Sequence, residues 1–147
     1  MSDACILHVE DEENDLLLLK LAFEDAGITL PVQVVTDGQM AIDYLGGAGL
    51  FADRAKFPLL SLVILDLKLP RKSGFEVLEW MRAQPLLRRM VVIICTSAEH
   101  EQDIARAYEL GANSYVLKPM NIAERIETVR RLKAWWLECN RFPPLSK

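Results

Sequence analysis

The sequence predicts an α/β fold in which five helices cover both faces of a parallel five-stranded sheet. Short apolar runs alternate with helical patterns five times along the 147 residues, as in chains built from strand-helix units. Two of the runs, residues 62–65 and 91–95, are apolar without alternation, which is typical of parallel strands buried on both faces. The length fits one domain, and a hydrophobic content of 51% is enough for one substantial core.

The expected elements follow from apolar runs for the strands and from stop signals for the helices. In chain order they are strand 5–9, helix 14–26, strand 32–35, helix 39–45, strand 62–65, helix 75–84, strand 91–95, helix 102–110, strand 115–117 and helix 122–138. Gly27, Gly46, Pro85 and Gly111 follow the first four helices, because glycine readily ends a helix and proline cannot continue one. A loop from about 48 to 58 separates the second helix from the third strand.

The composition excludes several classes of protein. The net charge of −4, with both signs spread along the chain, argues against a nucleic-acid-binding protein, which usually carries a basic patch. No apolar run approaches the roughly 20 residues that span a bilayer, so no membrane segment is expected. Cys5, Cys95 and Cys139 are odd in number and far apart, which favours neither a disulfide framework nor a zinc site. We therefore expect a cytoplasmic protein.

Reactive side chains follow four of the five expected strands. Glu10 and Asp11 end the first strand, Asp66 the third, Thr96 the fourth and Lys118 the fifth. The carboxyl ends of parallel strands lie at one edge of the sheet, where α/β proteins place their sites. Three converging carboxylates need protons or a cation, and Mg²⁺ suits a site with few carboxylates and phosphate oxygens. A carboxylate beside that cation can attack phosphorus.

Each of these residues also has a structural interpretation. Acids near Glu10 favour the N-terminal end of the first helix, and Asp66 and Thr96 are typical turn or cap residues. Lys118 could be a solvated charge. One such coincidence would carry little weight, but four strand ends with complementary chemistry favour a common site.

At this point the sequence resembles the receiver domains of two-component response regulators. The matching stretches are LHVEDE at 7–12, VILDLKLP at 63–70, SG at 73–74, CTSA at 95–98 and GANSYVLKP at 111–119. The resemblance implies a flavodoxin-like doubly wound sheet with strand order 2-1-3-4-5. It assigns residues 1–138 to the receiver domain and residues 139–147 to a C-terminal tail.

The resemblance also implies the chemistry of the site. Asp66 matches the phosphoacceptor, and Glu10 and Asp11 match the acidic pair that holds Mg²⁺, with Mn²⁺ as an expected substitute. Lys68 stands where the family gives a backbone carbonyl to the metal. Lys118 matches the lysine that pairs first with the acceptor carboxylate and then with the phosphoryl group.

The family's conformational switch is carried by two further positions. Thr96 matches the switch hydroxyl and Tyr115 the switch aromatic, while the Lys118–Pro119 bond matches one that is usually cis. The implied protein takes a phosphoryl group from a sensor histidine kinase and signals through the surface of its fourth helix, fifth strand and fifth helix. It catalyses only its own magnesium-dependent phosphorylation and dephosphorylation. The loop at 46–58 and the tail resemble the stand-alone regulators of bacterial phytochromes.

The last helix suggests a further contact. On a helical wheel, a stripe expected to pack on the sheet comprises Ile122, Ile126, Val129 and Trp136. An adjacent apolar shoulder comprises Leu132, Trp135 and Cys139. Because apolar surface outside the core stripe often marks an interface, we expect a homodimer through this helix and the tail. The alternative is that Phe142, Pro143 and Pro144 fold back and cover the shoulder.

Two other functions fit parts of the pattern. A phosphatase of the haloacid-dehalogenase type also uses an aspartate after an apolar strand, but it needs a second aspartate two positions later, where this chain has Lys68. A receiver-like scaffold that only binds partners would usually lack the acidic pair, the acceptor or the lysine, and all three are present here. A magnesium-dependent acyl-phosphate donor would separate these functions, because a receiver keeps one phosphoryl group.

Overall fold

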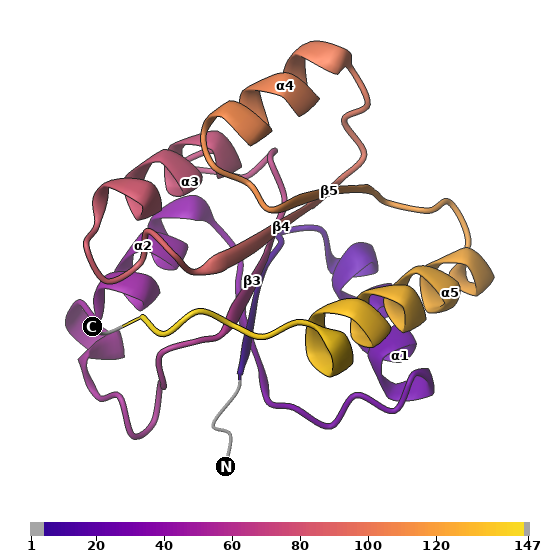
Figure 1. Ribbon diagram of the computed structural model, residues 1–147, viewed down its shortest axis with the longest axis horizontal. Helices are drawn as coiled ribbons and strands as arrows, with labels where there is room; N and C mark the ends of the chain where they lie inside the picture. The colour runs from indigo at the N-terminus through magenta and orange to yellow at the C-terminus, as the bar shows by residue number, and fades with distance from the viewer. Residues whose placement is uncertain (1–4, 146–147) are drawn as a thin grey trace.

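A computed structural model describes residues 5–145 and shows a parallel sheet between two layers of helices (Figure 1). The strands are β1 (Ile6–Val9), β2 (Val32–Val35), β3 (Leu62–Leu65), β4 (Val91–Thr96) and β5 (Ser114–Leu117). The α-helices are α1 (Glu13–Asp25), α2 (Gly38–Gly46), α3 (Gly74–Ala83), α4 (Glu101–Glu109) and α5 (Ile122–Leu132). All strand pairs are parallel and their order is β2-β1-β3-β4-β5, so the expected fold and topology are confirmed.

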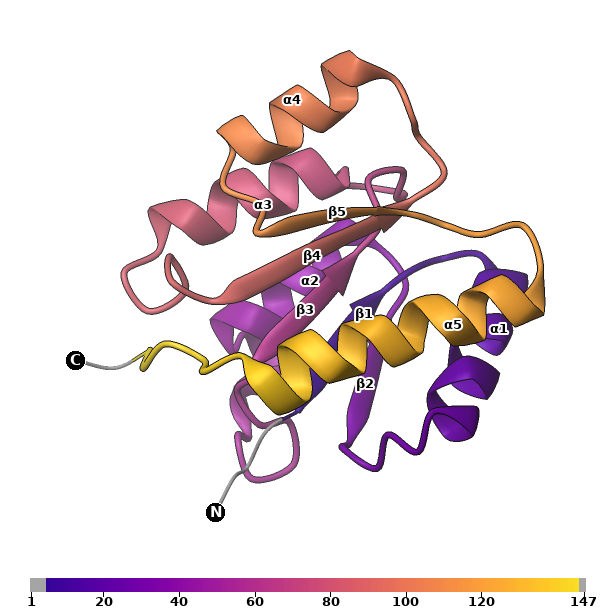
Figure 2. The same ribbon diagram turned by 45° about the vertical axis from the view of Figure 1, so that its right-hand side comes forward.

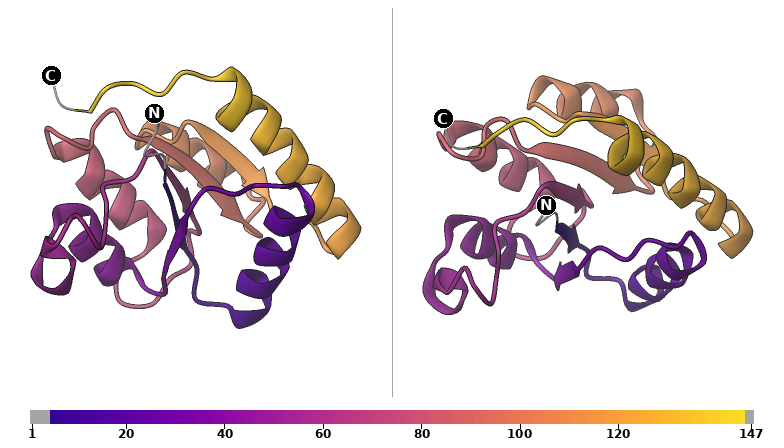
Figure 3. Two further views of the ribbon diagram at one scale, coloured as in Figure 1. Left: turned by 90° about the horizontal axis from the view of Figure 1, so that it is seen from below. Right: turned by 60° about the horizontal axis from the view of Figure 1, so that its bottom comes forward.

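Alternate side chains of the central strands build two cores. Leu7, Val63 and Val92 face the layer of α2, α3 and α4, while Ile6 and Ile93 face α1 and α5. The two layers lie on opposite sides of the sheet in the views of Figures 2 and 3. This burial on both faces explains why the central strands are continuously apolar, since every position removes apolar area from water.

The chain departs from the expected last helix at Lys133. The α-helix ends at Leu132 and continues as a π-helix, Lys133–Cys139, whose hydrogen bonds join residues five apart. This change of period alters which side chains face the sheet. Leu132 packs against the core with Leu137, five residues later, so placing Leu132 on an outer shoulder was wrong.

The other predictions for this helix are confirmed only in part. Val129 is buried, and Ile126 and Trp136 pack on the α1/α5 core as expected. Ile122 is 38% exposed because it begins α5, beyond the part of the helix that crosses the sheet, so its place in the packed stripe was wrong. Trp135 is 56% exposed, as the shoulder hypothesis requires.

The tail folds back along the molecule. Phe142 packs against the α1/α5 core, and Leu145 packs against the core on the opposite face of the sheet. Figure 3 shows the chain running from the end of α5 toward the α2/α3 layer. The tail therefore belongs to the fold up to residue 145, as the alternative proposed, although Trp135 stays uncovered. Residues 146 and 147 of the predicted tail, and residues 1–4 of the predicted domain, lie outside the described residues.

The remaining observations on the fold concern the loop after α2 and the length of the helices. The expected loop at 48–58 contains a short 3-10 helix, Gly49–Ala52, whose Phe51 packs against Tyr44 of α2 with ring centroids 5.0 Å apart. Within residues 5–145, no helix is long and apolar enough to cross a membrane.

The start of α3 fixes the segment that follows β3. Ser73 caps the helix through a capping box with Glu76, and the Gly74 amide donates to the Leu67 carbonyl at 2.9 Å. A Cβ atom at Gly74 would lie 2.1 Å from the Asp66 carbonyl oxygen and 2.7 Å from the Leu67 Cα atom. Only glycine allows this approach, so the helix start and the Asp66 backbone hold each other in place.

We expect Gly74→Ala to reduce the free energy of unfolding by about 3 kcal/mol, because backbone atoms must move to admit the methyl group. Gly46→Ala is the matched control, since a Cβ there would meet only the Trp80 ring at 3.5 Å. Urea denaturation measures both variants. Equal stability of the two variants would show that the close packing at Gly74 is not a constraint.

Candidate functional site

The carboxyl edge of the sheet collects the side chains that the sequence places after the strands. Glu10 follows β1, Asp66 follows β3 and Thr96 ends β4, with exposures of 1%, 6% and 0%. Lys118 follows β5, and its side chain is 8% exposed. These four predicted residues thus lie at one buried edge, where strand order places β1 and β3 at the centre.

The Lys118 ammonium joins three carboxylates. Its Nζ atom lies 2.7 Å from Glu10 Oε1, 2.7 Å from Asp66 Oδ2 and 2.8 Å from Asp15 Oδ2. An ammonium has three donors, so one bond to each carboxylate uses all of them. Burial lowers the pKa of Lys118, but the hydrogen bonds to Asp15, Asp66 and Glu10 outweigh that effect and raise it, which keeps the ammonium charged.

The Asp66 carboxylate is fixed through both oxygens. Oδ2 accepts from Lys118, while Oδ1 accepts from the Leu67 amide at 2.7 Å and from the Lys68 amide at 3.4 Å. The side chain therefore points into the cluster, not into the apolar core. The predicted use of the Lys68 backbone carbonyl as a metal ligand remains a prediction.

Glu10 is the most deeply buried acid of the site. Burial raises its pKa to about 7, since the neighbouring Asp66 charge adds to the effect and the Lys118 hydrogen bond only partly offsets it. Its second oxygen, Oε2, accepts from the Glu12 amide at 3.1 Å. A cation at this site would therefore compete with a proton for Glu10 near neutral pH.

Sequence analysis missed Asp15 and Arg125. Asp15, in the first turn of α1, contacts Lys118 through Oδ2 and the Arg125 guanidinium through Oδ1, the latter at 2.8 Å. Burial raises the pKa of Asp15, but the hydrogen bonds from Lys118 and Arg125 outweigh it and hold the pKa below its ordinary value. Arg125 also donates from Nε to the Pro119 carbonyl at 3.0 Å. No local motif marks these residues, because the contacts join α1 to positions more than 100 residues later.

The two predicted switch residues meet at the loop after β4. Thr96 is fully buried, and its Oγ1 accepts from the Ala98 amide at 3.4 Å. The Tyr115 hydroxyl donates to the Ala98 carbonyl at 2.7 Å. Both side chains are thus tied to one residue of the loop, so a movement of this loop would affect both.

Asp11 makes no contact with the Lys118 cluster, so its predicted metal role remains a prediction, and the Lys118–Pro119 bond differs from the expectation. The Asp11 side chain is exposed and, within the described part of the chain, makes no ion pair or hydrogen bond. The described residues contain no cis peptide bond, so the expectation of a cis Lys118–Pro119 bond was wrong. The trans form is the one that X–Pro bonds generally prefer.

The donor chemistry of the site fits a divalent cation. The acids joined in this cluster are Glu10, Asp15 and Asp66, whereas its only cations among the described residues are Lys118 and Arg125. The excess of carboxylate oxygens suits a hard cation such as Mg²⁺. In residues 5–145, however, no three acids, histidines or cysteines are already arranged as a metal-binding group. Because Lys118 contacts all three acids, a cation would require these side chains to rearrange.

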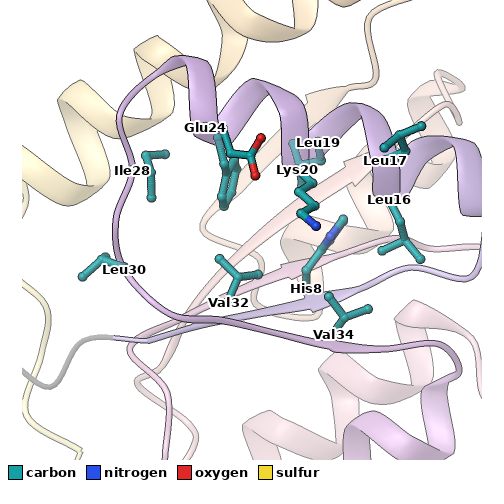
Figure 4. Close-up of a pocket in the computed structure, with 11 residues that line it drawn as sticks. His8, Leu16, Leu17, Leu19, Lys20, Glu24, Ile28, Leu30, Val32 and Val34 are labelled. Carbon is teal, nitrogen blue, oxygen red and sulfur yellow. The ribbon is translucent and has the colours of Figure 1, made fainter.

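A cavity of about 480 Å³ lies away from this edge, between α1 and β2 (Figure 4). Most of its lining is apolar, from leucines of α1 to Val32 and Val34 of β2. His8 also faces it, but burial and the Lys118 charge lower the pKa of this histidine to about 4, against the smaller opposite effects of Asp66 and Asp15, and keep it neutral. The cavity thus has no group of acids or nucleophiles comparable with the Lys118 cluster.

The comparisons with known proteins agree with this geometry. The family model of the response regulator receiver domain matches residues 6–130. Response regulator Rcp1 of Synechocystis sp. is 32% identical over 94% of this chain and 92% of its own, and a solved structure of it is an Mn²⁺-bound form with a TM-score of 0.86.

Two further solved structures are similar over nearly their full length. A response regulator in red light signalling of R. palustris is 36% identical, covers 95% of this chain and 98% of its own, and has a TM-score of 0.90. The phosphorylated cyanobacterial phytochrome response regulator RcpA is 31% identical, with coverage of 97% and 99% and a TM-score of 0.89. The chain therefore belongs to the response regulator receiver domain family.

Proposed function

We propose that this protein accepts a phosphoryl group on Asp66 from a sensor histidine kinase and passes on the signal by a change of shape. The observation that carries this proposal is the Asp66 carboxylate, held by Lys118 at 2.7 Å and by the Leu67 amide at 2.7 Å. The carboxylate lies beside an excess of acidic oxygens at the edge of the sheet. A carboxylate held in this way is already oriented for nucleophilic attack. The Lys118 ammonium is positioned to stabilise the negative charge of the transferred phosphoryl group.

The chemical step is an in-line transfer. An oxygen of Asp66 attacks the phosphorus of a phosphohistidine and forms a P–O bond while the P–N bond breaks. The electron pair of the broken bond returns to the imidazole nitrogen, which then takes a proton from water. The product is an acyl phosphate, and Lys118 neutralises part of its charge.

Glu10, Asp11, Asp66 and the backbone carbonyl of Lys68 would hold Mg²⁺, or Mn²⁺ in its place. The ion would neutralise charge on the phosphoryl oxygens. The Mn²⁺-bound form of Rcp1 supports this assignment for a relative. The protein's own contribution is the orientation of the carboxylates, which the Lys118 and Leu67 contacts maintain.

The signal would pass through the loop after β4. The acyl phosphate carries a charge of about −2 where the carboxylate carried −1, and this charge draws the Thr96 hydroxyl and Lys118 inward. Because Thr96 and Tyr115 are both bonded to Ala98, a shift of Thr96 alters the Tyr115 anchor and the α4-β5-α5 surface. The change is a shift between two populated conformations.

The partners follow from the relatives and from the surface. Since several relatives are phytochrome response regulators, we infer a kinase of the phytochrome type in the cytoplasm. For the output we infer a homodimer through α4, β5, α5 and the tail from residue 139. Leu117 of the edge strand β5 and Trp135 are 46% and 56% exposed there, and Trp135 lines an adjacent cavity of about 340 Å³.

We expect Asp66→Asn to abolish phosphorylation by acetyl phosphate and Mg²⁺, because an amide oxygen is not a competent nucleophile. Intact-mass spectrometry would show one stable phosphoryl adduct on the wild-type protein and none on the variant. Asp53→Asn is the matched control, since the exposed Asp53 only caps a turn at Ala55. Wild-type labelling of Asp66→Asn would exclude the acceptor, and release of phosphate without an adduct would favour a phosphatase.

We expect Trp135→Glu to raise the dimer dissociation constant at least ~30-fold, since a central aromatic contact is worth about 2 kcal/mol. Light scattering at high micromolar concentration, with and without acetyl phosphate and Mg²⁺, measures the mass. Leu50→Glu is the control, because Leu50 is 73% exposed on the short helix after α2. A monomeric wild-type protein under both conditions would contradict the dimer.

A further inference from the structure

We propose that Asp15 is a positioning residue that, together with Arg125, sets how much of the Lys118 ammonium is available to Asp66. The inference rests on the proposed function, because it concerns the reactivity of the Asp66 carboxylate. It adds two residues to the site that no sequence motif marks. Asp15 is the third anion on Lys118, and Arg125 is the only other described cation on Asp15.

The geometry of Asp15 shows that both of its oxygens are committed. Oδ2 lies 2.8 Å from Lys118 Nζ, and Oδ1 lies 2.8 Å from a terminal nitrogen of Arg125. The side chains of Asp15 and Arg125 are 19% and 11% exposed, so the pair is only weakly screened by water. Arg125 is fixed in turn by its bond to the Pro119 carbonyl, next to Lys118 in the chain.

An acid in the first turn of a helix often serves only to stabilise that helix. Asp15 does not cap α1, because its oxygens are bonded to the β5–α5 segment and not to the amides of the helix. A second ion pair, between Asp25 and Arg130, joins α1 to α5 at the other end and is about half exposed on both sides. The two pairs link the same helices, but only Asp15 contacts Lys118.

The sharing of one ammonium gives the two substitutions opposite effects. Without the Asp15 charge, Lys118 is divided between Glu10 and Asp66, so it binds Asp66 more tightly and resists entry of a cation or a phosphoryl group. Arg125 is then also left without its anion. Without the Arg125 charge, Asp15 attracts Lys118 more strongly and draws it away from Asp66, which leaves the acceptor carboxylate freer.

Two measurements test this coupling. Electron paramagnetic resonance with Mn²⁺ alone gives the dissociation constant for the ion, and intact mass gives the rate of phosphorylation by acetyl phosphate. We expect Asp15→Asn to weaken Mn²⁺ binding about tenfold and to slow phosphorylation. We expect Arg125→Gln to tighten Mn²⁺ binding and to speed phosphorylation. Asp15→Glu, which keeps the charge, should restore most of the wild-type behaviour.

The controls separate positioning from general loosening of the α1–α5 contact. Asp25→Asn and Arg130→Gln remove the exposed pair between the same helices and should leave both measurements unchanged. Arg125→Lys keeps the charge and should bind Mn²⁺ like the wild type, which covers the case in which Arg125→Gln does not fold.

Two results would overturn the inference: changes of the same sign in Asp15→Asn and Arg125→Gln, or the same effect in Asp25→Asn. Failure of the proposed function would look different. The wild-type protein would then take no phosphoryl group from acetyl phosphate, while the Mn²⁺ measurements would still report whether Asp15 and Arg125 control the charge at Lys118.

Discussion

One buried cation holds the functional edge of this protein together. Glu10 and Asp66 are almost fully removed from water, and a buried carboxylate without a partner is strongly unfavourable. Lys118 contacts both at 2.7 Å and extends the cluster to Asp15, so the three elements β1, β3 and α1 depend on a residue that follows β5. The arrangement leaves excess negative charge, which a divalent ion and then a phosphoryl group can redistribute.

The strand order and a few local contacts position the residues of this site. The order β2-β1-β3-β4-β5 puts the ends of β1 and β3 side by side, and the close approach of Gly74 fixes the Asp66 backbone. On the other side, Ala98 ties Thr96 and Tyr115 to one loop. The acceptor therefore lies between a rigid part, the start of α3, and the loop after β4, which is free to move when these two hydrogen bonds break. Such a division suits a switch between two conformations.

The sequence predicted the strands and the edge residues because both depend on local pattern: a side chain that directly follows a buried strand must lie at the edge of the sheet. Asp15 and Arg125 were missed because their contact joins helices through tertiary packing, which has no local signature. Leu132 was misplaced because the packed face of α5 is wider than the predicted stripe: Leu132 lies one turn after the buried Val129 and packs against the same core. Ile122 was misplaced because it begins α5, beyond the part of the helix that crosses the sheet. The roles of Asp11 and Lys68 depend on an ion, so they remain predictions.

The central claim is that Lys118 neutralises the buried acids, and the most direct test is the stability of Lys118→Met in EDTA. Without the ammonium, the raised pKa of Glu10, already about 7, rises further. The pKa of Glu10 is then higher in the folded protein than in the unfolded chain. Its contribution to stability is fully present at pH values below the unfolded pKa and is lost as the pH rises through the folded pKa. Urea denaturation should therefore show a loss of about 3 kcal/mol against wild type at pH 8 and a smaller loss at pH 5.5. An unchanged free energy of unfolding at pH 8 would contradict the account.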